Sequence, residues 1–232
     1  MQRAKAVEAR GNRAVGEKSR LLRVIETEAP LTLRPLIFHG RRLARLEYVS
    51  VVYGGNGVLE NLSFEVMQGE RLLLRGKNGS GTSSLRRALA GKSGACEGDI
   101  FLPGGLGVSY GPQDSSWING TLKAFSCNRN IRENLLRAVL HRFGFERSQF
   151  DTPLEDLSAG QKKKVLLAAS LCEEAHLYVW DEPLNYIDVI SRMQIEHLIL
   201  QCRPGMVLVE HDSVFTGKVA TSVIDLDEMR AR

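Results

Sequence analysis

The apolar positions of this chain occur in short runs that glycine-rich turns separate. Residues 43–53, 62–66 and 72–75 are rich in valine, leucine and aromatic residues, a composition that is typical of strands. Residues 177–180 and 206–209 are shorter and wholly apolar, which predicts strands that are buried inside a sheet.

Between these runs, apolar residues recur with helical spacing. This spacing predicts helices over residues 131–143, 159–173 and 189–201, and a further helix from Gly81 to about Ala90. Short strands are expected within a glycine-rich stretch, residues 97–110. The order of strand, loop, helix and then a strand that ends in acidic residues predicts a parallel α/β core.

The N-terminal segment differs from the rest of the chain. Residues 1–28 predict a helix, because alanine and glutamate are frequent and apolar residues recur at roughly helical spacing. The apolar stripe is thin, so we expect this helix to project from the domain or to pack lightly. Pro30 and Pro35 end the helix and predict an extended connector over residues 31–38.

Composition narrows the class of protein. The 232 residues suit one large domain, or one domain with an extension, and the contents of 43% hydrophobic and 25% charged residues are ordinary. No apolar run approaches the ~20 residues that span a bilayer, and the N-terminus lacks the apolar segment of a signal peptide. We therefore expect a cytoplasmic protein without membrane insertion. The cysteines are far apart in sequence and form no C-x-x-C pair, so reduced thiols are expected.

The net charge of +4 is too small to indicate nucleic-acid binding by itself. Its distribution is uneven, because residues 1–45 contain many more lysines and arginines than acidic residues. Non-specific contacts with RNA phosphates would explain this excess, and so would a charged helix surrounded by water. The sequence alone does not separate these two interpretations.

A glycine-rich loop follows the apolar run at residues 72–75. It fits the phosphate-binding pattern G-x-x-x-x-G-K-[ST], in which backbone N–H groups and the start of the next helix face an anion. Ser83 is a candidate Mg²⁺ ligand through its hydroxyl group. The alternative is a strand-to-helix turn without a ligand. The candidate phosphate-binding residues are Gly76, Asn78, Gly79, Ser80, Gly81, Thr82, Ser83 and Ser84.

Thr82 occupies the position at which this pattern has a lysine. That lysine reaches the β- and γ-phosphates as a point charge. A hydrogen bond to a charged group contributes ~1.5–3 kcal/mol, or about 10- to 100-fold in affinity. Lys77 lies at the start of the loop, where a solvated side chain is a better interpretation than a substitute for the lysine. We therefore expect binding of a phosphate-containing ligand to be retained more readily than transfer of its phosphoryl group.

Two further motifs suit the same chemistry. Asp181 and Glu182 follow the apolar run at residues 177–180, so Asp181 suits a direct or indirect Mg²⁺ ligand and Glu182 suits the base that polarises a water molecule. Ser158 begins a predicted helix as a natural N-cap. The N–H groups of that turn would suit an anion, although an ordinary helix cap explains the same residues.

Residues 157–161, Leu-Ser-Ala-Gly-Gln, resemble the L-S-G-G-Q signature of ATP-binding-cassette proteins, with Ala159 in place of one glycine. The resemblance covers residues 43–228. It implies an α/β P-loop NTPase fold with a parallel RecA-like core, an antiparallel β subdomain and a helical subdomain at about residues 114–160. By this resemblance, the nucleotide-binding residues of the signature are Ser158, Gly160 and Gln161.

The same resemblance implies roles for four more residues and two cofactors, ATP and Mg²⁺. Gln113 is similar to the glutamine that senses Mg²⁺ and the γ-phosphate, which makes it a catalytic and metal-binding candidate. His211 resembles the switch histidine that contacts the γ-phosphate. Asp188 resembles the aspartate of the D-loop, and Tyr53 resembles the aromatic residue that stacks on adenine.

Several segments resemble the F subfamily of these proteins (ABC-F), which are soluble, carry two cassettes joined by a charged helical linker and in many cases act on ribosomes. Residues 1–42 resemble the end of that linker with its connector, so residues 43–232 would be the ATP-binding domain. Residues 180–192 are similar to the second cassette of the antibiotic-resistance branch that protects the ribosome.

This resemblance implies two kinds of partner. One is a second cassette, either in the same full-length chain or in a homodimer, and the other is the ribosome with its rRNA and tRNA. Two alternatives stay open: the nucleotide-binding subunit of a transporter, and a degenerate cassette that binds ATP without efficient hydrolysis.

Overall fold

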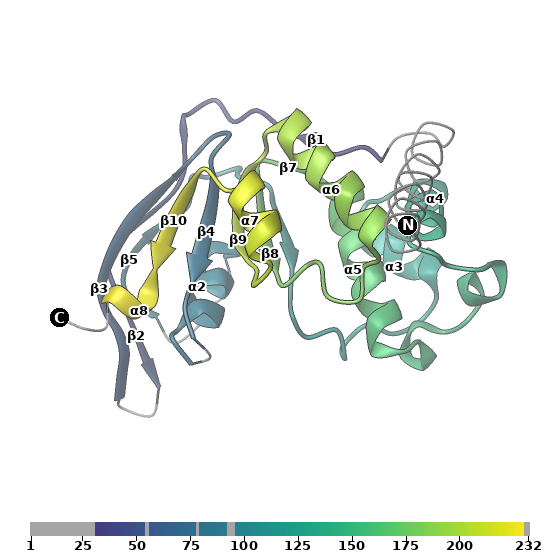
Figure 1. The fold of residues 1–232 in the computed structure, drawn as a ribbon, viewed down its shortest axis with the longest axis horizontal. Coiled ribbons are helices and arrows are strands. Elements are labelled where there is room, and N and C mark those ends of the chain that lie inside the picture. The colour runs from purple at the N-terminus through teal and green to yellow at the C-terminus, as the bar shows by residue number, and fades with distance from the viewer. Residues whose placement is uncertain (1–30, 54–55, 78, 92–95, 230–232) are drawn as a thin grey trace, which may run out of the picture.

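The computed structural model describes residues 31–53, 56–77, 79–91 and 96–229 (Figure 1). The helix predicted over residues 1–28 lies outside these residues. At the centre is a five-stranded sheet in the order β10-β4-β9-β8-β6, and every pair of neighbours in it is parallel. Its strands are β4 (Arg71–Arg75), β6 (Val108–Gly111), β8 (Leu177–Asp181), β9 (Gly205–Val209) and β10 (Ser222–Asp225).

Alternate residues of the central strands belong to two different apolar clusters. Leu73, Tyr178 and Leu208 lie in one cluster, whereas Leu72 and Val207 lie in the other. Because successive side chains of a strand point to opposite faces, both faces of the sheet are covered. This confirms the predicted parallel α/β core.

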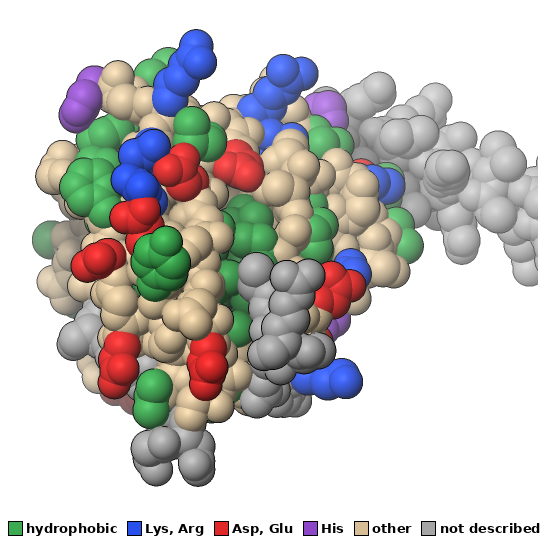
Figure 2. Space-filling view, turned by 90° about the vertical axis from the view of Figure 1, so that its left-hand side faces the viewer, with side chains coloured by type: hydrophobic (Ala, Val, Ile, Leu, Met, Phe, Trp, Pro, Cys, Tyr) green, Lys and Arg blue, Asp and Glu red, His purple; other side chains and the backbone are tan. Residues whose placement is uncertain are grey.

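A second sheet covers one of these faces. It is antiparallel, has the order β3-β2-β5 and consists of β2 (Arg42–Tyr53), β3 (Asn56–Met67) and β5 (Cys96–Phe101). Strand β3 is longer than the strand predicted over residues 62–66, because the pairing with β2 begins at Asn56, which pairs with Tyr53. On the outer face, acidic and basic side chains alternate with hydrophobic ones (Figure 2), and Arg42 pairs with Glu65 at 3.0 Å.

Helices pack on both faces of the parallel sheet. Helix α2 (Thr82–Leu89) contributes Leu85 and Leu89 to the cluster under the antiparallel sheet. The helices α5 (Ala159–Cys172), α6 (Val189–Cys202) and α7 (Ser213–Val219) contribute to the other cluster. A short helix, α8 (Leu226–Met229), follows β10.

A group of helices lies at the end of the molecule opposite the antiparallel sheet (Figure 1). It contains α3 (Leu122–Asn128), α4 (Glu133–Arg142) and the 3-10 helices η1 (Arg147–Phe150) and η2 (Leu154–Asp156). Helix α3 is not among the predicted helices. Thr121 caps it, since its side chain accepts a hydrogen bond from the amide of Ala124 at 3.1 Å.

The predicted extended connector is present and docks on the domain. Its strand β1 (Arg34–Pro35) pairs in parallel with β7 (Glu174–Ala175), and the amide of Leu36 donates to the carbonyl of Ala175 at 2.8 Å. Leu31 and Leu33 are buried in the same cluster as α4 and α5. The connector is therefore an integral part of the apolar core.

Candidate functional site

The phosphate loop joins strand β4 to helix α2, as the sequence predicts. Gly79 and Gly81 have φ angles of 82° and 91°, a left-handed conformation that glycine adopts without strain. A Cβ atom at Gly81 would come within 3.3 Å of the Val51 side chain, and one at Gly76 would collide with the Ser80 hydroxyl. Gly79 and Gly81 are therefore favoured by their backbone conformation, and Gly76 is required because a Cβ atom has no room there.

Gly81 is also the N-cap of helix α2 and offers no capping side chain. The first N–H groups of a helix need an acceptor from outside the helix, and an anion fits this need. Ser80 is fully buried, and its hydroxyl has no hydrogen-bond partner among the described residues. This arrangement fits the phosphates of a nucleotide.

The remaining residues of the loop differ in their exposure to solvent. Thr82 is half-buried at the start of α2, and Ser84 is buried behind it. Lys77 is exposed, and its backbone amide donates to the carboxylate of Asp227 at 3.1 Å. This geometry favours a solvated Lys77 side chain. Asn78, at the centre of the loop, lies outside the described residues.

Arg86 lies one turn after Thr82 on helix α2 and contacts two of the three predicted metal ligands, Ser83 and Asp181. Its guanidinium forms an ion pair with the carboxylate of Asp181, and its Nη2 donates to Oγ of Ser83 at 2.8 Å. The side chains of Arg86 and Asp181 are only 3% and 5% exposed. Burial raises the pKa of Asp181, while the charges of Arg86 and Lys163 oppose this shift.

The residues as arranged do not fit a bound Mg²⁺ ion. Magnesium requires nearly octahedral oxygen ligands at about 2.0–2.1 Å, and a guanidinium already bridges Ser83 and Asp181. Across the part of the chain that the structure describes, no group of three or more His, Cys, Asp or Glu side chains is placed to hold a metal ion. The metal-ligand roles of Ser83, Asp181 and Gln113 stay predictions that this arrangement does not favour.

Glu182 lies at the end of strand β8 and is surrounded by hydrogen-bond donors. Its Oε2 accepts from Nε2 of Gln113 at 3.2 Å and from Nδ2 of Asn185 at 2.8 Å. Nε2 of His211 lies 3.5 Å from Oε1 of Glu182. The structure thus brings together the three residues predicted to be catalytic, Glu182, Gln113 and His211.

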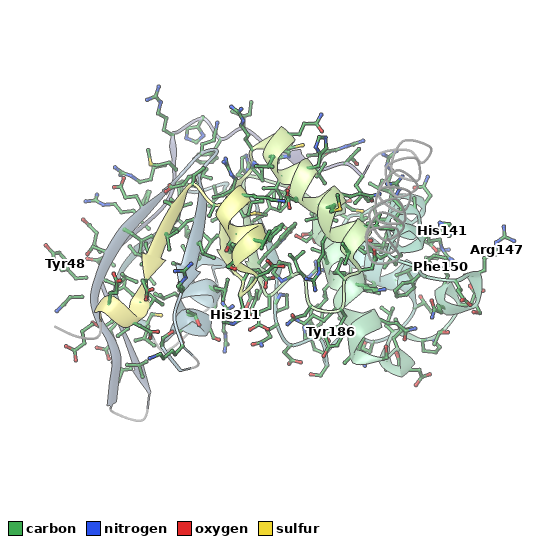
Figure 3. All side chains as sticks on the ribbon, viewed as in Figure 1. Tyr48, His141, Arg147, Phe150, Tyr186 and His211 are labelled. Atoms are coloured by element: carbon green, nitrogen blue, oxygen red, sulfur yellow. The ribbon has the colours of Figure 1, made fainter. Side chains whose placement is uncertain are left out.

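The backbone holds Glu182 in a strained but fixed position. Its φ angle is 46°, in the left-handed region that costs a non-glycine residue roughly 1–2 kcal/mol. Its amide donates to the carbonyl of Val209 at 2.8 Å, which ties it to strand β9. His211 follows the same strand, is 68% exposed and points to the same edge of the molecule as Tyr186 (Figure 3). Such strain is common where a side chain must be presented to a ligand.

A second cation reaches this region from helix α5. The ammonium nitrogen of Lys163 is buried and has no hydrogen-bond partner among the described residues. Burial lowers the pKa of Lys163, although the negative charges of Asp181 and Glu182 raise it. Sequence reasoning missed both Lys163 and Arg86, because each stands beside another basic residue on a helix and resembles a surface charge.

The signature turn forms a closed capping box at the start of α5. Oγ of Ser158 accepts from the amide of Gln161 at 3.3 Å, and Oε1 of Gln161 accepts from the amide of Ser158 at 2.8 Å. A Cβ atom on Gly160 would lie 3.2 Å from the ring of Tyr186. The ordinary cap is thus present, and contacts of these residues with a nucleotide stay a prediction.

Asp188 has a local role as the N-cap of α6. It accepts hydrogen bonds from the amide and the hydroxyl of Ser191 at 2.9 and 2.7 Å. Although burial raises its pKa, these hydrogen bonds leave the pKa of Asp188 below its usual value. Tyr53 ends strand β2, but its side chain lies outside the described part of the structure. The predicted nucleotide contacts of both residues remain predictions.

Comparisons with known proteins agree with this geometry. Residues 59–185 match the family model described as ABC transporter. The chain is 28% identical over 194 residues to the ribosome protection protein VmlR of Bacillus subtilis (strain 168), which covers 79% of this chain and 34% of that protein. It is 30% identical over 193 residues to the zinc import ATP-binding protein ZnuC of Pseudomonas putida, which covers 80% of this chain and 75% of that protein.

Solved structures show the same fold. The archaeal ribosome recycling factor aABCE1, in complex with the ribosomal stalk protein aP1, aligns with a TM-score of 0.64 and 26% identity over 82% of this chain and 38% of that chain. The predicted mixed α/β cassette, with a parallel sheet, an antiparallel sheet and helices, is thereby confirmed. The chain spans about a third of the length of the B. subtilis relatives that it matches.

Proposed function

The chain belongs to the ABC transporter family of ATP-binding domains, and we propose that it is one half of a two-cassette ABC-F protein that acts on the ribosome. The similarity to the B. subtilis ribosome protection protein carries this proposal, because it extends over 79% of this chain. The basic excess in residues 1–45 supports it, since a ribosomal partner presents RNA phosphates. Ribosome protection is the activity that the name of this relative suggests. The resemblance of residues 180–192 to the antibiotic-resistance branch suggests that the protection is against an antibiotic.

In this proposal, the phosphate loop of the chain and the signature turn of a second cassette hold ATP between them. Gly76, Gly79 and Gly81 bind phosphates through backbone N–H groups, and Tyr53 stacks on adenine. Ser158, Gly160 and Gln161 serve the nucleotide of the partner cassette. Asp188 lies at the same interface.

The arrangement of Glu182 suits a base that holds water beside the γ-phosphate, with Gln113 and His211 as its neighbours. Hydrolysis is slow in this proposal, because Thr82 cannot supply the positive charge of a lysine to the transferring phosphoryl group. ATP binds more tightly to the paired cassettes than to the separated ones, so ATP favours the paired state. Slow hydrolysis prolongs that state.

A second candidate is the ATP-binding subunit of an importer. The similarity to the zinc import protein ZnuC favours it, because the chain covers 75% of that relative. Among the described residues, no helix has the length and apolar character that crossing a membrane requires. In this candidate, the partner of the chain is a separate membrane-embedded protein.

Sedimentation with ribosomes separates the two candidates. We would pellet ribosomes with the purified chain in the presence of ATP, of ADP and of no nucleotide. We expect ATP to increase the fraction of chain in the pellet, and Glu182→Gln to increase it further because bound ATP persists. Glu97→Gln removes an exposed carboxylate from strand β5 and is the matched control.

An unchanged pellet fraction in all nucleotide states would overturn the ribosomal proposal. Co-purification of the chain with a membrane-embedded protein would instead support the importer subunit.

A further inference from the structure

We propose that this site binds ATP without a protein-bound divalent metal ion, because Arg86 occupies the position between Ser83 and Asp181. The inference rests on the proposed ATP-binding function and specifies the form of the nucleotide that the site accepts. In P-loop NTPases, the serine or threonine of the loop and the aspartate at the end of another strand of the sheet hold Mg²⁺. In this chain, the same two side chains are joined by a guanidinium group.

The position of Arg86 is fixed on several sides. It is 2% exposed as a whole residue, and it lies on a helix whose neighbouring residues Leu85 and Leu89 are fully buried. A buried arginine is tolerated when its charge is paired and its N–H groups are used. Asp181 supplies the paired charge, so its removal would leave the buried guanidinium charge uncompensated. Ser83 supplies an acceptor, so its removal would leave one N–H group of Arg86 without this hydrogen bond.

The surrounding charges also disfavour a divalent ion. The charge of Lys163 on helix α5 also acts on Asp181, so two cations already act on one buried carboxylate. A Mg²⁺ ion placed beside Asp181 would face repulsion from both, in a region where burial weakens solvent screening. Arg86 and Lys163 thus take over the neutralisation of Asp181 that a metal ion would otherwise provide.

The loop retains groups that suit a phosphate. The hydroxyl of Ser80 is buried without a hydrogen-bond partner among the described residues. A hydroxyl group can donate a hydrogen bond, and an unsatisfied buried donor is unfavourable. Phosphate oxygens that enter the loop would accept hydrogen bonds from this hydroxyl and from the N–H groups at the start of α2.

Thr82 and Arg86 are related in this view. The pattern lysine is absent at Thr82, and a positive charge appears one turn later on the same helix. The charge is moved from the phosphate side of the loop to the carboxylate of Asp181. Together, Thr82 and Arg86 therefore define a nucleotide site in which an arginine side chain, and no metal ion, supplies the positive charge beside Asp181.

The test is an equilibrium titration of the purified chain with ATP, once with excess Mg²⁺ and once with EDTA. For the unmodified chain, we expect the two dissociation constants to agree within about threefold. For the double variant Thr82→Lys, Arg86→Leu, which restores the lysine and empties the bridging position, we expect Mg²⁺ to tighten ATP binding by about tenfold or more. Arg87→Leu, at the adjacent exposed position on α2, is the control and should behave as the unmodified chain.

The unmodified chain decides the inference even where the double variant fails to fold. ATP binding that is lost in EDTA and present with Mg²⁺ would overturn the metal-free site and leave the proposed ATP-binding function intact. An absence of ATP binding under both conditions would overturn the proposed function and the inference together.

Discussion

Arg86 and Asp181 form a buried ion pair that links the last turn of helix α2 to the carboxyl end of strand β8. The two side chains come from distant parts of the sequence and are almost completely removed from solvent. Their pairing connects the phosphate loop to the acids that follow β8. We therefore expect this ion pair to affect the stability of the domain as well as the dependence of ATP binding on Mg²⁺.

Removal of one partner of this pair should destabilise the domain strongly. We expect Arg86→Leu to lower the free energy of unfolding by about 3–5 kcal/mol, because Asp181 then remains buried without its paired charge. The double variant Arg86→Leu, Asp181→Leu should recover most of this loss, since a buried pair replaced by apolar residues is often nearly neutral. Urea denaturation of both variants checks this. Equal losses in the single and double variants would contradict a coupled pair.

Thr82→Lys should increase the affinity for ATP by about 10- to 100-fold, because an ammonium group is returned to the phosphate loop. An equilibrium titration with ATP measures this change. Lys77→Ala is the matched control, since the exposed Lys77 side chain is expected to leave the affinity unchanged. If Lys77→Ala weakened binding as much as Thr82→Lys strengthened it, Lys77 would be the substitute for the missing lysine.

The contact between Gly160 and Tyr186 predicts a coupled pair of substitutions. Alanine usually stabilises a helix by up to about 1 kcal/mol relative to glycine, but a Cβ on Gly160 would press on the Tyr186 side chain at 3.2 Å. We therefore expect Gly160→Ala alone to change the free energy of unfolding little. In the background of Tyr186→Gly, which removes the contacting atoms, it should stabilise by about 1 kcal/mol.

Gly217→Ala, in helix α7, provides the comparison, because a Cβ there meets no other atom within 4 Å. It should stabilise the domain by about 0.5–1 kcal/mol. An equal gain from Gly160→Ala in both backgrounds would show that the Tyr186 side chain moves aside at no cost.

Asp188 predicts a pH dependence of stability. The pKa of its folded-state carboxyl lies below the usual value, so the stabilisation is present above the unfolded-state pKa and is lost as pH falls through the folded-state pKa. Asp188→Ala should cost about 1 kcal/mol at neutral pH, and this difference should shrink in acid. Urea denaturation over a pH series tests it, with Asp99→Ala at an exposed strand position as control. A constant difference across the series would contradict the ionised cap.

The strongest features of the fold follow directly from the sequence pattern. Strands β8 and β9 extend only one residue beyond the predicted 177–180 and 206–209, because wholly apolar runs bounded by polar residues have few other conformations. Helix α3 was missed because its seven residues carry too short an apolar pattern. The two-residue strands β1 and β7 depend on each other and have no local signal.

In the candidate site, too, residues with a local sequence motif could be predicted and residues that depend on a distant partner could not. The motifs place Glu182, Gln113 and His211 at the ends of predicted elements, and the structure brings them together. Arg86 could not be assigned in the same way, because an arginine on a helix normally reaches solvent. Its burial depends on the carboxylate of Asp181, which lies on a strand far along the chain. The spacing of Arg86 to the buried Leu89, three residues later, was the available signal.

The most direct measurement of the central claim is ATP binding and ATP turnover in one preparation of the unmodified chain. We predict saturable ATP binding together with a rate of phosphate release at least about tenfold below that of the Thr82→Lys variant. Saturation would establish the phosphate loop as a nucleotide site, and slow release would establish the effect of Thr82. A chain that binds no ATP at any concentration, or that matches the turnover of Thr82→Lys, would contradict the account.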